Sequence, residues 1–170
     1  MSGPKRAVIL VGHGGIPNDR PRELLMRLKE MEGQRRVTGA SPTAAEIELD
    51  RRIRRWPRTT ETDPYAAGLQ ALAARLRPLL DGTPLVLAYN EYCAPSLEEA
   101  AGELIKAGVA EIVVMPSMAT PGGSHSEIEI PQTLDRLRAA HAGVTFRYAW
   151  PFDLDLVAGM FAEHLRKVLG

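Results

Sequence analysis

Three side chains able to bind a metal ion each follow an apolar run that is typical of a buried β-strand. They are His13, Glu91 and His125. The runs before them are residues 7–11, 85–90 and 112–116. In a parallel sheet the carboxyl ends of neighbouring strands meet at one edge, where ligands bind. Two imidazoles and one carboxylate that meet there would form an open site for a first-row divalent metal.

Apolar patterns along the chain predict the strands and helices that would position these side chains. The predicted strands are residues 6–11, 85–89, 112–115 and 144–149, and the predicted helices are residues 22–36, 44–56, 64–80, 96–106, 130–141 and 153–169. Residues 57–62 and the glycine-containing residues 117–126 are predicted to be linking segments. This alternation predicts an α/β fold of the doubly wound, flavodoxin-like kind, with a parallel sheet flanked by helices. Right-handed crossovers then place all the strand ends on one side.

Signals at the helix ends support these boundaries. The predicted N-cap residues are Thr43, Asp63 and Ser96, whose side-chain oxygens can accept from free backbone N–H groups. Pro78 should distort or end the helix over 64–80, because proline lacks a backbone N–H. Gly33 and Gly39 should weaken the end of the helix over 22–36.

The composition is that of an ordinary globular protein. The 170 residues predict one domain, 1–170, with a helical insertion at about 17–62. A formal net charge of zero gives no sign of a nucleic-acid or membrane partner. One cysteine, Cys93, excludes an internal disulfide framework. Because no apolar run is long enough for a signal peptide or a membrane span, we expect a cytoplasmic protein.

Three ordered motifs resemble those of a known enzyme family, the class II chelatases of the CbiX type, which include the sirohydrochlorin cobaltochelatases, nickelochelatases and ferrochelatases. The motifs are GHG at 12–14, EYCAPSLEEA at 91–100, and GGSH at 122–125 with Ile130-Pro131 after it. The resemblance covers residues 6–15 and about 65–168. It implies a parallel sheet of four or five strands. It also implies the ATP-independent insertion of Co²⁺, Fe²⁺ or Ni²⁺ into a sirohydrochlorin-type tetrapyrrole, in cobalamin or siroheme biosynthesis.

The resemblance assigns the metal to His13, Glu91 and His125. Three protein ligands leave positions open for pyrrole nitrogens, and neutral histidine can also accept a pyrrole proton near neutral pH. We therefore expect both histidines to bind metal or accept protons, and Glu91 to bind or orient the metal. The sequence does not divide these roles, and no organic cofactor is expected.

Residues near these ligands are candidates for binding the macrocycle. The predicted substrate-binding residues are Gly14, Gly15, Met118, Gly122, Gly123, Ser124, Arg20 and Arg22. Glycines permit the close approach of a flat ligand, and arginines can pair with its carboxylates. The run Arg51, Arg52, Arg54 and Arg55 could do the same or form a solvated face, and Met118 could simply pack its loop.

The sequence departs from the family pattern in ways that bear on the substrate more than on the fold. The segment 17–62 is longer than expected, Thr120-Pro121 lies in the loop before His125, and Asn90 replaces an expected apolar residue. Short family members pair, so we expect a homodimer, although the insertion could cap the site and make a monomer sufficient.

Other interpretations are weaker or stay open. A histidine phosphatase would carry arginine directly before its histidine, where this chain has Gly12, and the Gly-x-Ser-x-Gly motif of serine hydrolases is absent. A non-catalytic metal or tetrapyrrole carrier would use the same ligands. Cys93 could be a soft ligand or a small buried side chain, and Glu127 and Glu129 are interpreted as helix-start anions.

Overall fold

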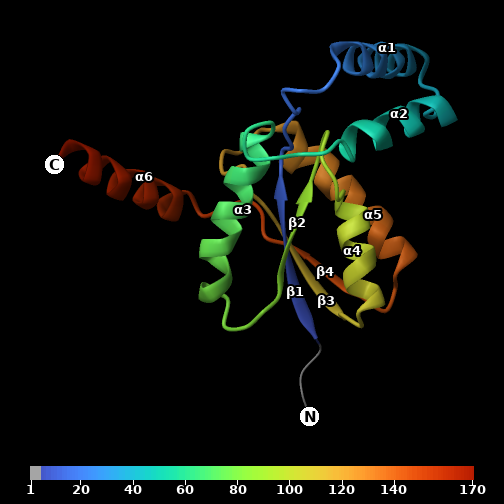
Figure 1. Ribbon diagram of the computed structural model, residues 1–170. Coiled ribbons are helices and arrows are strands. Elements are labelled where there is room, and N and C mark those ends of the chain that lie inside the picture. The colour runs from blue at the N-terminus through green and yellow to red at the C-terminus, as the bar shows by residue number, and fades with distance from the viewer. Residues whose placement is uncertain (1–4) are drawn as a thin grey trace.

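A sheet of four parallel strands forms the centre of the molecule. The computed structural model describes residues 5–170. The strands are β1 (Arg6–Gly12), β2 (Leu85–Tyr89), β3 (Glu111–Pro116) and β4 (Thr145–Tyr148). They lie in the order β2-β1-β3-β4 (Figure 1). The predicted parallel α/β fold is confirmed, and the strand bounds agree with the predicted ones to within one residue.

Strand register brings the three strand ends together. Gly12 at the end of β1 pairs with Tyr89 at the end of β2. On the other side of β1, Val11 pairs with Pro116 at the end of β3. The loops that follow these strands therefore leave the sheet side by side.

Helices cover the two faces of the sheet unequally. Helix α3 (Pro64–Leu76) lies on one face, and helices α4 (Leu97–Lys106) and α5 (Ile130–Ala140) lie on the other (Figure 1). The side chains of β1 alternate between the two cores, as a strand buried on both faces requires. Ile9 joins the α4–α5 core, whereas Leu10 joins the α3 core.

The predicted helix starts are confirmed in detail. The hydroxyl of Thr43 accepts from the backbone N–H of Glu46, and Ser96 forms a complete capping box with Glu99. The carboxylate of Asp63 accepts from the backbone of Ala66. As Pro78 predicts, α3 ends early, at Leu76, and a short 3₁₀ turn η1 (Arg77–Leu79) follows.

The insertion forms two helices beyond the carboxyl edge of the sheet (Figure 1). They are α1 (Arg22–Thr38) and α2 (Ala44–Arg54). Gly33 does not end α1, which stops instead at Gly39 with a left-handed φ of 67°. Leu28 of α1 and Ile53 of α2 are buried against Tyr92, from the loop after β2. The insertion thus packs on the same loop that carries Glu91.

Two further elements differ from the simple prediction. Residues 125–129, expected to begin in a loop, form a π-helical turn η2 (His125–Glu129) that continues into α5. The last helix, α6 (Leu154–Leu169), projects away from the sheet (Figure 1). No helix between residues 5 and 170 combines the length and the apolar character that crossing a bilayer requires.

Candidate metal centre

His13, Glu91 and His125 converge at the carboxyl edge of the sheet. One possible ligand atom from each residue lies within 4.8 Å of the other two. The two imidazole rings meet edge-on, with centroids 4.6 Å apart and planes at 76°. Three residues from distant parts of the chain therefore form one cluster able to hold a small cation.

His13 is exposed and is held by its own loop. Its backbone N–H donates to the hydroxyl of Tyr65 at 2.7 Å, and its Nδ1 lies 2.9 Å from the carbonyl oxygen of Gly14. A carbonyl oxygen can only accept, so Nδ1 carries the proton in this contact. The lone pair of the neutral ring then lies on Nε2, which is left for a metal.

The loop of Glu91 is joined to the loop of His13 by backbone contacts. The N–H of Glu91 donates to the carbonyl of His13 at 2.8 Å, and the N–H of Asn90 donates to that of Gly12 at 2.9 Å. A Cβ added to Gly14, whose φ is +99°, would lie 1.8 Å from the carbonyl oxygen of Glu91. Glycine is required there because the protein's own backbone approaches.

Gly15 is constrained in a similar way. A Cβ at this position would lie 2.7 Å from a carboxylate oxygen of Asp63 and 3.1 Å from Cβ of Tyr65. The crowding at Gly14 and Gly15 is therefore explained by contacts within the chain. Gly122, Gly123 and Ser124 are exposed in the turn before η2.

His125 lies at the start of η2 rather than in a loop, and two side chains hold it. Its Nδ1 is 2.6 Å from the amide nitrogen of Asn90 and 3.0 Å from a carboxylate oxygen of Glu129. Asn90 also donates to Glu129 at 2.6 Å. With 15 % of its side chain exposed, His125 is the more enclosed of the two histidines.

Glu129 is part of this cluster, which the interpretation as a helix-start anion did not anticipate. Burial alone would raise the pKa of Glu129, but hydrogen bonds from Asn90 and His125 outweigh it and hold the pKa below its usual 4.5. The carboxylate is therefore ionised at neutral pH. The spacing of four residues from His125, which places both on one helix face, was the signal available in the sequence.

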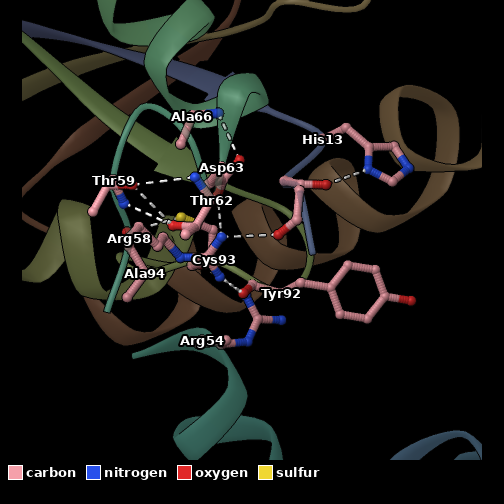
Figure 2. A network of polar contacts seen from close by, with 12 residues as sticks. His13, Arg54, Arg58, Thr59, Thr62, Asp63, Ala66, Tyr92, Cys93 and Ala94 are labelled. Atoms are coloured by element: carbon pink, nitrogen blue, oxygen red, sulfur yellow. Dashed lines mark hydrogen bonds and ion pairs between the residues drawn. The ribbon is translucent and has the colours of Figure 1, made fainter. Parts of the chain in front are cut away.

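Arg58 joins the two loops that carry His13 and Glu91, as Figure 2 shows. Its guanidinium donates to the carbonyl of Gly15 at 2.9 Å, and also to the carbonyl of Tyr92. It forms an ion pair with Asp63, whose side chain is only 1 % exposed. Sequence reasoning missed Arg58 because it falls in a segment expected to be a linker.

The arginine run of the insertion is engaged mainly by the protein itself. Arg54 pairs with Asp50 and donates to the carbonyl of Asn90 at 3.1 Å. Arg51 pairs with Glu48, and Arg55 with Glu99, at exposed positions. These contacts indicate that these three arginines support the fold or lie in solvent, because their charges are already paired within the protein and are not free to pair with substrate carboxylates.

The other candidates are placed less favourably for a ligand. Arg20 is buried and donates to the carbonyl of Pro21, whereas Arg22 is exposed at the start of α1. Met118 packs against the α4–α5 core, as loop packing predicts. Burial raises the pKa of Cys93 to about 11, so it stays a thiol at neutral pH and behaves as a small buried side chain.

A cavity of about 450 Å³ opens beside the cluster, between the insertion and the sheet edge. Its walls include Arg35, Arg36 and Arg54 from the insertion and Glu91, Asn90 and Glu129 from the cluster. A larger cavity of about 910 Å³ lies elsewhere, along β2 and α4, and its lining contains none of the three candidate ligands.

Comparison with solved structures finds the same fold in sirohydrochlorin chelatases. The chain matches SirB from Bacillus subtilis with Fe³⁺ at 18 % identity and a TM-score of 0.53, over 93 % of this chain and 45 % of that one. A cobalt complex of SirB from the subspecies spizizenii matches at 15 % identity and a TM-score of 0.47, over 95 % and 50 %. The chain thus spans about half the length of the SirB chains.

A shorter relative matches along its whole length. A CbiX protein from Marinobacter aquaeolei VT8 has 19 % identity and a TM-score of 0.50, over 97 % of this chain and 98 % of that one. At such low identities these likenesses show the fold alone. No curated protein matches the chain. The family model CbiX, however, matches residues 58–167, which is more than half of the sequence. The chain therefore belongs to the CbiX family of class II chelatases.

Proposed function

We propose that this protein inserts a divalent metal into a sirohydrochlorin-type tetrapyrrole, with His13, Glu91 and His125 holding the incoming ion. The observation that carries the proposal is the convergence of their ligand atoms to within 4.8 Å. Membership of the CbiX family supports the same reaction class. The metal is a substrate of this reaction, taken from solution and given to the macrocycle.

The ligand set suits an ion that must be released. Imidazole nitrogen binds Co²⁺, Fe²⁺ and Ni²⁺, and the carboxylate neutralises part of their charge. Three protein ligands leave coordination positions for the pyrrole nitrogens, so the ion can pass from protein to macrocycle without leaving the site.

Two pyrrole N–H protons must be removed for each metal inserted. The side chain of His13 is exposed, and its Nδ1 lies against a backbone carbonyl. Once the ion has passed to the macrocycle, the freed Nε2 can take a proton and pass it to solvent. His125 is enclosed and fixed by Asn90 and Glu129. We assign proton acceptance chiefly to His13 and metal retention chiefly to His125 and Glu91.

The macrocycle would lie over the exposed turn of Gly122, Gly123 and Ser124, with the insertion beside it. Of the insertion arginines that line the neighbouring cavity, Arg54 is held by Asp50 and Arg35 by Glu46. Arg36 is exposed on the same cavity wall and is the residue we assign to a substrate carboxylate. A role in cobalamin or siroheme biosynthesis in the cytoplasm is part of the same proposal.

The test is a visible-spectrum assay of the purified protein with sirohydrochlorin and Co²⁺, Fe²⁺ or Ni²⁺. Formation of the metallated product faster than in the metal-only control is the expected result. Spectral changes on binding, with no gain in rate over that control, would replace the enzyme with a carrier of metal or tetrapyrrole.

A further inference from the structure

Tyr92 follows the candidate ligand Glu91 directly and has a backbone conformation that residues with a side chain rarely adopt. Its φ is +53°, in the left-handed region. The N–H of Cys93 donates to the carbonyl of Glu91 at 2.6 Å, which closes a three-residue turn with Tyr92 at its centre. Such a turn with a positive φ at the central residue is rare and strained. Because strained backbone persists only where the surrounding structure holds it, contacts from outside the turn must hold Tyr92.

The insertion holds both the ring and the carbonyl of Tyr92. Only 8 % of the residue is exposed, because it packs with the buried side chains of Leu28 from α1 and Ile53 from α2. The ammonium of Lys29, also from α1, lies over the ring at 5.0 Å from its centroid, as a cation–π contact. Arg58 donates to the carbonyl of the same residue. A ring packed between two helices leaves its own Cα little freedom, so these contacts can maintain the left-handed turn.

The insertion also holds the backbone on both sides of Glu91. The guanidinium of Arg54 donates to the carbonyl of Asn90 at 3.1 Å and to that of Cys93 at 3.4 Å. The backbone carbonyl of Arg54 accepts from the N–H of Ala94 at 3.1 Å. Figure 2 shows Arg54 beside this loop. Polar groups of the loop before and after Glu91 are therefore paired with the insertion.

We propose that Tyr92 is a positioning residue for Glu91, and that the insertion keeps the Glu91 carboxylate turned toward the two histidines. The ligand atoms of the three residues lie within 4.8 Å of one another. Without the packing on its ring, Tyr92 would return to a negative φ, and this change would move the carboxylate of the residue before it. His13 and His125 lie on other segments and would keep their places. The inference rests on the proposed function in one respect, namely that Glu91 binds the metal.

The first test is the dissociation constant for Co²⁺, measured by absorption titration of the purified protein. Tyr92→Ala and Leu28→Ala should each raise it about 10-fold, as expected when a ligand loses its orienting contacts. Tyr92→Gly should lose less affinity than Tyr92→Ala, because glycine adopts a positive φ readily. Met26→Ala, 70 % exposed on α1, is the control and should bind Co²⁺ as the wild type does. Unchanged binding by folded Tyr92→Ala and Leu28→Ala would overturn the proposal.

A double-mutant cycle tests whether Tyr92 acts through Glu91. In a Glu91→Ala background, Tyr92→Ala should change the Co²⁺ dissociation constant by less than about twofold, because the carboxylate that it orients is already absent. A purely structural role would give the same 10-fold loss in both backgrounds, and this result would contradict positioning.

A third measurement needs no metal. The N–H of Glu91 donates to the carbonyl of His13 at 2.8 Å, and its hydrogen exchange can be followed by NMR in the metal-free protein. Leu28→Ala should speed this exchange about 10-fold or more, because loss of the packing lets the loop open locally. Met26→Ala should leave it unchanged. Equal exchange in Leu28→Ala and wild type would refute support of the loop by the insertion. Failure of the proposed function would instead show as an absence of metal insertion, with these exchange rates as expected.

Discussion

The side-chain amide nitrogen of Asn90 lies 2.6 Å from Nδ1 of His125. The same nitrogen donates to Glu129, which also lies next to Nδ1. These contacts occupy one ring nitrogen, so Nε2 is the nitrogen left for a metal. The polar residue at position 90, where an apolar one was expected, therefore fixes a candidate ligand.

Loss of this support should weaken metal binding without unfolding the protein. Residues that orient a ligating histidine contribute about 10- to 100-fold to metal affinity. We expect Glu129→Gln and Asn90→Leu each to raise the Co²⁺ dissociation constant by about 10-fold, measured by absorption titration. Glu127→Gln, an exposed neighbour on the same helical turn, is the control. Wild-type affinity in both Asn90→Leu and Glu129→Gln would exclude an orienting role.

Gly14→Ala should be strongly destabilising. The new Cβ would lie 1.8 Å from the carbonyl oxygen of Glu91, on a backbone with φ of +99°. Strained backbone alone costs about 1–3 kcal/mol, and the clash also separates the two loops of the site. Urea unfolding measures the loss in unfolding free energy. Gly68→Ala, in open space on α3, should be neutral or stabilise by about 1 kcal/mol. Equal stability of the two variants would refute this account of Gly14.

Arg58→Ala should reduce the stability of the fold, because it leaves the buried carboxylate of Asp63 without its ion-pair partner. It should also reduce metal affinity, because Arg58 joins the loops that carry His13 and Glu91. Removing one member of a buried pair costs about 3–5 kcal/mol. The contrast is Arg55→Ala, which breaks the exposed pair with Glu99 and should cost under about 1 kcal/mol. Chemical denaturation measures the loss in unfolding free energy for both variants. Similar losses for the two arginines would show that Arg58 does not join the loops.

The lowered pKa of Glu129 predicts a pH dependence. A carboxyl whose pKa is lower in the folded than in the unfolded protein stabilises the fold above its unfolded value, near 4.5. That stabilisation is lost as the pH falls through the folded value. The difference in unfolding free energy between wild type and Glu129→Gln should therefore shrink from pH 6 to pH 3. A difference that stays constant across this range would contradict the lowered pKa.

The sequence predicted the strands and helix starts well because these depend on local chemistry. Runs such as residues 7–11 are buried on both faces, and Asp63 and Ser96 cap helices through contacts within three residues. The convergence of His13, Glu91 and His125 was also predictable, since parallel strand ends share one edge.

Features that depend on tertiary contacts were not predictable in the same way. The glycines before His125 favour a loop, yet the π-helical turn η2 begins at that residue. Arg58 lies in a stretch that lacks the apolar periodicity of a helix or a strand. Its role depends on the backbone carbonyls of Gly15 and Tyr92, which are both more than 30 residues away in the sequence. The apolar spacing of α6 predicts a helix with one buried face, but no residue of this helix is buried in the structure.

The most direct test of the central claim is the initial rate of Co²⁺ insertion into sirohydrochlorin by His13→Ala/His125→Ala. Because loss of proton transfer alone costs about 10²–10⁴-fold, the rate should fall to that of the metal-only control. His141→Ala, at the end of α5, should keep the wild-type rate. A folded double variant that inserts cobalt as fast as the wild type would contradict the assignment of this cluster as the catalytic metal site.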